Sequence, residues 1–257
     1  MENEIIKQKK TACTNVFSER IPLWMGQLPE KYMEILKPYY DFFVLRSLFE
    51  KQSARSKSFM AYGWEFDPFC NNYLGLALTK ILPSMQGIPR IAERKTDFLS
   101  VLEQNHLTEK ELSDLNESRF AVVKASAKKG NNEFMSLFYH IRNALSHGRI
   151  GIKEGTDELV FVFEDGLLKR KKAEPNFEVT ARAIISKSKL DAMIRVIKKP
   201  PKCAESVLMA IQNGYVTKKE IMAFTGFKEE FLWKTTIEKL KNNRRIEYKN
   251  NKWQLVH

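Results

Sequence analysis

The 257-residue chain is long enough for one large or two modest domains, and its 43% hydrophobic composition argues against general disorder. A net charge of +12 and a pI of about 9.5 indicate an anionic partner, nucleic acid first and an anionic membrane surface second, unless the charge serves only solubility. Three scattered cysteines argue against a disulfide framework and a zinc ribbon, and no apolar run is long enough to cross a bilayer. We therefore expect a soluble, cytoplasmic protein.

The first half of the chain predicts a flexible arm followed by a bundle of helices. Residues 1–20 are polar and contain several lysines. Beyond them apolar residues recur at helical spacing, and Pro38 is expected to kink or split the first helix. Asp67 and Pro68 suit the first positions of a second helix, and a capping box opens the fourth. The predicted helices span residues 30–54, 67–83, 91–104 and 108–123.

An amphipathic helix is predicted next, beginning near Phe134. Its apolar residues lie on one face at the helical period, and Gly148 is well placed to end it. Arg142, Asn143 and His147 lie away from that face, toward solvent or a partner. At about 100° per residue, Asn143 and His147 are about 40° apart, whereas Arg142 and His147 are about 140° apart. These three side chains are the first candidates for chemistry.

A small β element and a linker follow this helix. Residues 159–163 have high β-propensity, Glu164-Asp165-Gly166 reads as a turn, and the chain resumes toward a lysine-rich run, which predicts a hairpin. A third strand is expected around residues 177–185, and a helix over 189–197. Residues 199–203 read as a linker, which separates a helical domain over 21–198 from a C-terminal domain over 204–257.

Residues 204–257 predict three short helices followed by a hairpin, which is the element order of a winged helix-turn-helix domain. Such domains bind DNA most often, but they also serve as protein contacts, and RNA is a third possible partner here. The excess positive charge is concentrated at the end of the third helix and on the hairpin. The candidate contacts with nucleic acid there are Lys241, Arg244, Arg245, Lys249 and Lys252.

Arg142, Asn143 and His147 together carry the groups that RNA cleavage needs when no metal takes part. A histidine titrates near neutral pH and suits removal of the proton from a 2′-hydroxyl, and a guanidinium suits stabilisation of charge on the attacked phosphate. Asn143 would orient the histidine or the phosphate by hydrogen bonding. The alternative is that Arg142 and His147 only interact with the carbonyl groups at the C-terminal end of the helix.

The pattern of Arg142, Asn143, three further residues and His147, at the end of a bundle helix that precedes a β element, resembles the HEPN superfamily (higher eukaryotes and prokaryotes nucleotide-binding domains). The resemblance covers roughly residues 20–198, and its specific part is Arg142 to His147. It implies a metal-independent endoribonuclease without a cofactor, in which a homodimer places two motifs face to face. It also implies a toxin or an anti-phage effector, with an antitoxin or other regulatory partner.

Several other residues are secondary candidates for binding nucleic acid. His140 either assists on the side of Asn143 or is an ordinary, partly buried histidine, and Arg149 either binds phosphate or is solvated. The run Lys169, Arg170, Lys171 and Lys172 either extends an RNA track or is a solvated strand edge. A zinc site is not expected, because His140 and His147 would be about 10 Å apart along one helix and lack further ligands.

We therefore expect a mainly α protein, in which a HEPN-like helical bundle with a small β insertion precedes a winged-helix domain. The expected activity is RNA cleavage at a homodimer interface, with no membrane partner. One alternative is a DNA-binding regulator that dimerises through the bundle and binds a palindromic site. The other is a protein-interaction module without activity. Two Arg142–His147 pairs that face each other across a two-fold cleft would favour the enzyme.

Overall fold

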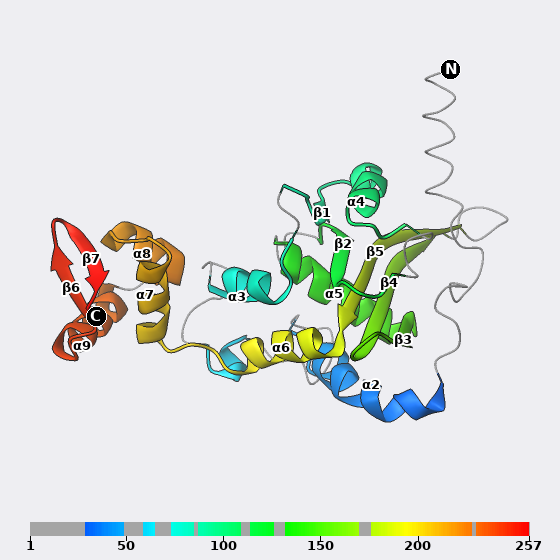
Figure 1. Ribbon diagram of the computed structural model, residues 1–257, viewed down its shortest axis with the longest axis horizontal. Coiled ribbons are helices and arrows are strands. Elements are labelled where there is room, and N and C mark those ends of the chain that lie inside the picture. The colour runs from blue at the N-terminus through cyan, green and yellow to red at the C-terminus, as the bar shows by residue number, and fades with distance from the viewer. Residues whose placement is uncertain are drawn as a thin grey trace, which may run out of the picture. The chain divides into compact units, whose positions relative to one another are not determined.

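The computed structural model describes residues 29–48, 59–64, 73–84, 87–108, 114–125, 132–169, 176–227 and 230–256. The predicted arm and the basic residues Arg170 to Lys172 lie outside these ranges. The chain divides into two units, one formed by Met1–Ser56 with Leu82–Asp191 and the other by Lys57–Ile81 with Ala192–His257. Figure 1 shows the elements of both. None of the helices that the structure describes combines the length and the apolar character of a membrane span.

The first unit is built around a five-stranded mixed sheet with the order β1-β2-β5-β4-β3. The pairing of β1 with β2 is parallel, and the other three pairings are antiparallel. The strands are β1 (Ile91–Ala92), β2 (Arg119–Val123), β3 (Ile150–Glu154), β4 (Leu159–Lys169) and β5 (Asn176–Ser186).

This sheet shows that the expectation of a mainly α helical bundle is wrong. Residues 119–123, predicted at the end of a helix, form β2, which lies between β1 and β5. Phe120, Ala121 and Val122 are fully buried. A strand that is buried on both faces has a continuous apolar run without alternation, and periodicity alone does not separate such a run from a buried helix. The predicted helix over 91–104 likewise begins only at Phe98, after β1.

The predicted turn at Glu164-Asp165-Gly166 is also wrong, because β4 continues through it. The pairing contains a bulge at this point: Asp165 pairs with Ala181 and Gly166 with Val179, so Thr180 is an extra residue on β5. A Cβ at Gly166 would overlap the Glu178 carbonyl oxygen and would lie 2.5 Å from the Phe177 ring. Only glycine fits this close approach of the two strands. The strand predicted around residues 177–185 is confirmed as β5.

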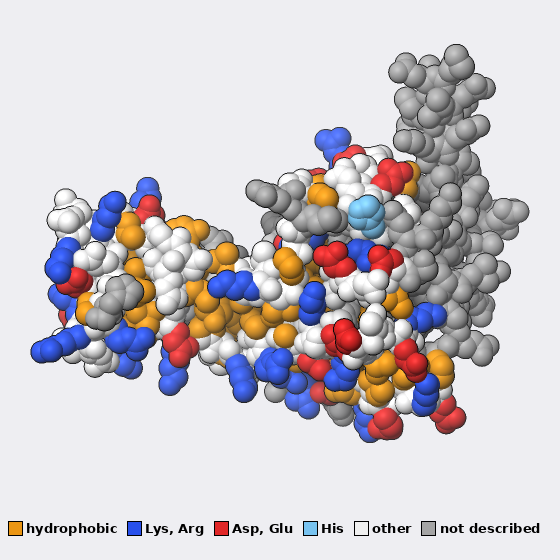
Figure 2. Space-filling model, in the orientation of Figure 1, with side chains coloured by type: hydrophobic (Ala, Val, Ile, Leu, Met, Phe, Trp, Pro, Cys, Tyr) orange, Lys and Arg blue, Asp and Glu red, His pale blue; other side chains and the backbone are white. Residues whose placement is uncertain are grey.

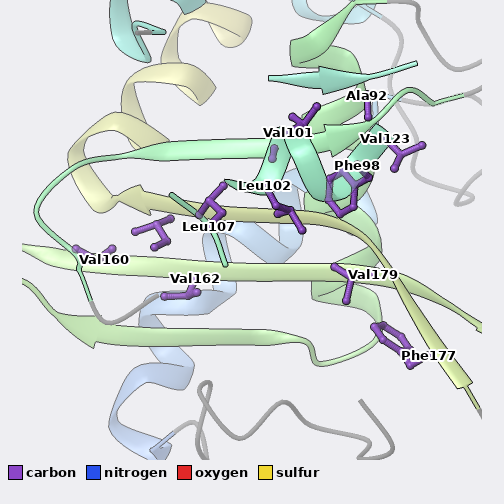
Figure 3. Close-up of a cluster of buried hydrophobic side chains, with 12 residues drawn as sticks. Ala92, Phe98, Val101, Leu102, Leu107, Val123, Val160, Val162, Phe177 and Val179 are labelled. Atoms are coloured by element: carbon purple, nitrogen blue, oxygen red, sulfur yellow. The ribbon is translucent and has the colours of Figure 1, made fainter. Parts of the chain in front are cut away.

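Helices cover both faces of the sheet. On one face, α4 (Phe98–Gln104) contributes Phe98, Val101 and Leu102 to an apolar cluster with side chains of β2, β4 and β5, as Figure 3 shows. The other face packs against α5 (Glu133–Ser146) and, through Tyr39, against α2 (Met33–Tyr40), while the π-helical turn η2 (Asp41–Leu45) packs on α5. Ring pairs mark these contacts, with centroids 5.8 Å apart for Phe120–Phe134, 4.7 Å for Tyr39–Phe161 and 6.0 Å for Phe43–Phe138. The helix α5 is therefore fixed against the sheet along its apolar side.

The second unit contains the three helices and the hairpin predicted near the C-terminus. Thr217 and Glu220 form the predicted capping box of α8. Asn250 and Asn251 both have positive φ, at 52° and 60°, as a two-residue hairpin turn requires. The elements are α7 (Cys203–Gln212), α8 (Lys218–Thr225), α9 (Glu230–Asn242), β6 (Ile246–Lys249) and β7 (Lys252–Leu255). The winged-helix assignment and the domain limits at 198 and 204 stay predictions.

The remaining described elements of this unit precede the C-terminal helices along the chain. Trp64 is buried, and its Nε1 donates a hydrogen bond of 2.9 Å to the Ile197 carbonyl. This bond ties the segment after η3 to the last turn of α6. The elements are η3 (Phe59–Tyr62), α3 (Tyr73–Ile81) and α6 (Lys187–Lys198), and the last of these begins in the first unit.

The bulge at Gly166 predicts that Gly166→Ala destabilises the protein by about 2 kcal/mol or more, because the new methyl group must displace the Phe177 ring or the backbone of β5. Gly75→Ala in α3 is the matched control, since a Cβ there meets nothing within 4 Å. It should leave stability unchanged or raise it by about 0.5–1 kcal/mol. Urea denaturation of both variants measures the difference, and equal effects would contradict the steric argument.

Candidate active site

The candidate motif occupies the last turns of α5, whose two ends are set by local hydrogen bonds. At the start, the Asn132 side chain accepts from the Met135 N–H at 2.8 Å. At the end, Gly148 has a φ of +66°, the Arg149 N–H donates to the Ala144 carbonyl at 2.8 Å, and the Gly148 N–H donates to the Leu145 carbonyl at 3.3 Å. This is the Schellman arrangement, which confirms the predicted stop at Gly148.

A chain of hydrogen bonds connects Arg142 to the sheet. The Arg142 Nη1 donates to Asn143 Oδ1 at 2.9 Å, and Asn143 Nδ2 donates to Asp165 Oδ2 at 3.0 Å. Asp165 is buried in β4, while Arg142 and Asn143 are half-buried. The Arg142 Nε is itself shielded from solvent and meets no hydrogen-bond partner in the part of the chain that the structure describes. The guanidinium is thus fixed through one nitrogen while further donors are left over.

His140 lies in the core beneath this chain. Its Nδ1 is 2.7 Å from Asp165 Oδ2, and its Nε2 is 2.8 Å from the Val123 carbonyl oxygen. The carbonyl only accepts, so Nε2 carries a proton, and one more proton must lie between Nδ1 and the carboxyl group. The Asn143 side chain and the Gly166 N–H also donate to this carboxyl group. The two buried side chains therefore form a hydrogen-bonded pair.

Alternation along β4 explains why Asp165 reaches α5. Side chains two residues apart lie on the same face of a strand, so Asp165 shares the face of Phe161 and Phe163, whereas Glu164 faces the opposite side. The sequence reasoning missed Asp165, because it read this tripeptide as a turn. Phe161, Phe163 and Asp165 occupy alternating positions, and this pattern was a signal in the sequence. If the strand had been extended through Gly166, the pattern would have placed the Asp165 carboxylate on the side of α5.

His147 occupies a different environment from His140. It is the C-cap residue of α5, its backbone N–H donates to the Asn143 carbonyl at 2.9 Å, and its side chain is exposed. Within the described ranges no hydrogen bond joins the side chains of Arg142 and His147. The single chain therefore fixes Arg142 to the sheet and leaves the His147 imidazole open to solvent.

Arg149, which was predicted either to bind phosphate or to be solvated, is buried and forms an ion pair within the chain. The side chain is 7% exposed, forms an ion pair with Glu164 and lies with its guanidinium carbon 3.6 Å from the centroid of the Phe177 ring. Arg182 Nε donates to the same carboxylate at 3.0 Å. Burial raises the pKa of the Glu164 carboxyl, and the two guanidinium groups oppose that rise. His140, predicted as a further contact, is buried in the same way.

The other predicted nucleic-acid contacts lie elsewhere in the chain. Lys169 ends β4, and Arg170, Lys171 and Lys172 fall outside the described residues. The five candidates of the second unit, Lys241, Arg244, Arg245, Lys249 and Lys252, are all exposed. Over the described ranges, no group of three or more His, Cys, Asp and Glu side chains is arranged to hold a metal ion.

Comparison with known protein families gives one match. The family model described as HEPN pEK499 p136 matches residues 47–199, which is more than half of the chain and includes all of α5 and β4. Neither a curated protein nor a solved structure showed significant similarity to the chain.

The buried pair of His140 and Asp165 predicts that Asp165→Ala lowers the free energy of unfolding by about 3 kcal/mol, because it leaves the buried His140 imidazole and the Asn143 amide without their partner. Asp157→Ala is the matched control, since that carboxylate is exposed in the loop before β4, and its effect should stay within about 0.5 kcal/mol. Urea denaturation tests the pair of variants. A loss no larger than that of the control would mean that the carboxylate does not hold α5 to the sheet.

Proposed function

The chain belongs to the HEPN pEK499 p136 family, and from this premise we propose that it is a metal-independent endoribonuclease with a site formed by Arg142, Asn143 and His147. HEPN domains are typically ribonucleases, which supports a nuclease activity in general. The family match does not extend to the residues after 199. The assignment of the site to α5 depends on the hydrogen bonds that hold the polar side chains of this helix.

One observation carries the proposal: Asn143 and Asp165 hold the Arg142 guanidinium by hydrogen bonds of 2.9 and 3.0 Å in series. An arginine that only stabilised the end of a helix would donate to the terminal carbonyl groups. Instead, the sole hydrogen bond of this guanidinium within the described residues is to Asn143. A guanidinium that is held in place with donors left over is suited to bind two oxygens of a phosphate group.

The proposed reaction uses Arg142 and His147 in separate roles. The His147 imidazole takes the proton of a ribose 2′-hydroxyl, and the 2′-oxygen attacks the adjacent phosphorus. Arg142 stabilises the negative charge that develops on the phosphate oxygens. The bond to the 5′-oxygen breaks, and that oxygen leaves with a proton from a protonated histidine. The products are a 2′,3′-cyclic phosphate, or a 3′-phosphate after hydrolysis, and a 5′-hydroxyl.

A homodimer would complete this arrangement. Arg142 is fixed toward β4, whereas the exposed His147 follows it by more than one helical turn, so the two side chains of one copy diverge. A two-fold axis would place Arg142 of one copy beside His147 of the other, so that each dimer holds two sites with one arginine and one histidine each. We extend the proposal to a cytoplasmic toxin or anti-phage effector that is controlled by a regulatory partner protein.

An RNase assay tests the activity. His147→Asn and Arg142→Ala should each lower the cleavage rate of an RNA by about 100-fold or more, and EDTA should have no effect. His106→Asn is the matched control, because His106 is exposed and lies outside the motif, and asparagine tolerates its positive φ of 51°. Activity that persists in both motif variants, or that disappears with EDTA, would rule out the proposed mechanism.

Mixing two inactive variants tests the shared site. In a heterodimer of Arg142→Ala and His147→Asn chains, one site has lost both groups and the other retains both. Half of the dimers in an equal mixture are of this kind, so the mixture should recover about a quarter of the wild-type rate. A mixture that stays inactive after subunit exchange would place both groups of each site within one chain.

A further inference from the structure

The second unit carries a basic surface whose chemistry differs from that of the motif on α5. We define the C-terminal basic surface as residues 238–252, from the end of α9 through the turn of the β6–β7 hairpin. It contains six basic residues against two acidic ones, a net charge of +4: Lys239, Lys241, Arg244, Arg245, Lys249 and Lys252 against Glu238 and Glu247. Figure 2 shows lysine and arginine side chains on the exterior of these elements, at the left of the view.

Little of this positive charge is neutralised within the protein. Lys241, Arg244 and Arg245 form no ion pair in the part of the chain that the structure describes. Lys249 is 2.8 Å from Glu247, but the lysine side chain is 62% exposed, so the pair is screened by solvent. The positive charge therefore attracts an anionic partner such as a phosphate backbone.

An aromatic row ends in the middle of this surface. Trp233 of α9 is buried, its ring centroid is 6.1 Å from that of Trp253, and Trp253 is 4.9 Å from Tyr248. Tyr248 pairs with Trp253 in the hairpin, so both rings lie on the same face. The row runs from the core to Tyr248, whose side chain is 52% exposed. Lys249 follows Tyr248 in β6 and pairs with Lys252 across the turn, so these two basic side chains lie at the same end of the hairpin, on the face opposite the ring.

We propose that the C-terminal basic surface binds single-stranded nucleic acid, with Tyr248 stacking on an unpaired base while basic side chains of the same surface contact phosphates along the strand. Positive charge alone would attract a duplex equally well. An exposed ring adds affinity only for a base that is free of its own stack, and each such contact contributes about 1–3 kcal/mol in proteins that bind single strands. The aromatic row supports Tyr248 from beneath, so the ring is held in position before binding.

Fluorescence anisotropy with the full-length His147→Asn chain tests this surface without cleavage of the probe. The probes are a labelled 16-nucleotide RNA and a DNA of the same sequence, each alone and as a duplex. Both single strands should bind about tenfold more tightly than the duplexes. Tyr248→Ile keeps an apolar, β-branched side chain against Trp253 but removes the ring, and it should weaken single-strand binding about tenfold while duplex binding stays unchanged.

Two controls make the result specific to the ring. Tyr248→Phe should bind as tightly as the parent, and Tyr40→Ala should do so too, because it removes a comparably exposed ring from α2 in the first unit. A difference between RNA and DNA single strands would identify which of them the surface prefers. Duplexes that bind as tightly as single strands, a Tyr248→Ile chain with unchanged affinity, or no binding of any probe would overturn the proposal. The outcome does not depend on whether the chain cleaves RNA.

Discussion

The Asp165 carboxylate is the point at which the helix that carries the motif is joined to the sheet. It interacts with His140 at 2.7 Å and accepts from Asn143 at 3.0 Å, and both residues belong to α5. The His140 Nε2 also forms a hydrogen bond with the Val123 carbonyl at the end of β2. One buried carboxylate thus connects β2, β4 and α5 through polar contacts, in addition to the apolar contacts of the same helix. Because such contacts are directional, they fix the rotation of α5 about its axis more closely than apolar packing does.

Two neighbouring acidic residues in β4 have opposite effects on the positive charge around the site. Glu164 faces the side of α4 and binds the buried Arg149 and Arg182, so those two guanidinium groups are unavailable for an anionic substrate. Asp165 faces α5 and binds its arginine only through Asn143. An amide between carboxylate and guanidinium orients the cation without neutralising it directly. The guanidinium of Arg142 is therefore not paired directly with a carboxylate, whereas that of Arg149 is.

The features that the sequence predicted well depend on residues close together in the chain. Gly148 ends α5, Thr217 and Glu220 cap α8, and Asn250 and Asn251 form the turn of the last hairpin, because each structure is fixed within about five positions. The sheet was missed because it depends on distant pairings. Phe120 of β2 pairs with Ala183 of β5, and burial on both faces removed the alternation by which a strand is recognised.

The same distinction between local sequence and distant pairing applies to the residues of the candidate site. The grouping of Arg142, Asn143 and His147 as a site stays a prediction from the sequence, whereas the family match over residues 47–199 supports the superfamily that the motif resembles. The sequence did not reveal Asp165, since the residue types of Glu164-Asp165-Gly166 are typical of a turn. Only their pairing with β5 makes these residues part of a bulged strand. The burial of Arg149 was missed for a related reason: whether a cation next to a helix end is solvated depends on which strand carries its counter-ion.

The difference in restraint between the two proposed catalytic groups bears on how the site would work. Arg142 is positioned through two successive hydrogen bonds to a buried residue, whereas the exposed His147 side chain is attached to the end of a helix. A general base contributes most when it is held close to the proton that it removes, so a freely rotating imidazole is a poor catalyst until something orients it. A second copy of the chain or the bound RNA would supply that restraint. The activity would then depend on assembly, which is a simple way for a ribonuclease to remain inactive as a single chain.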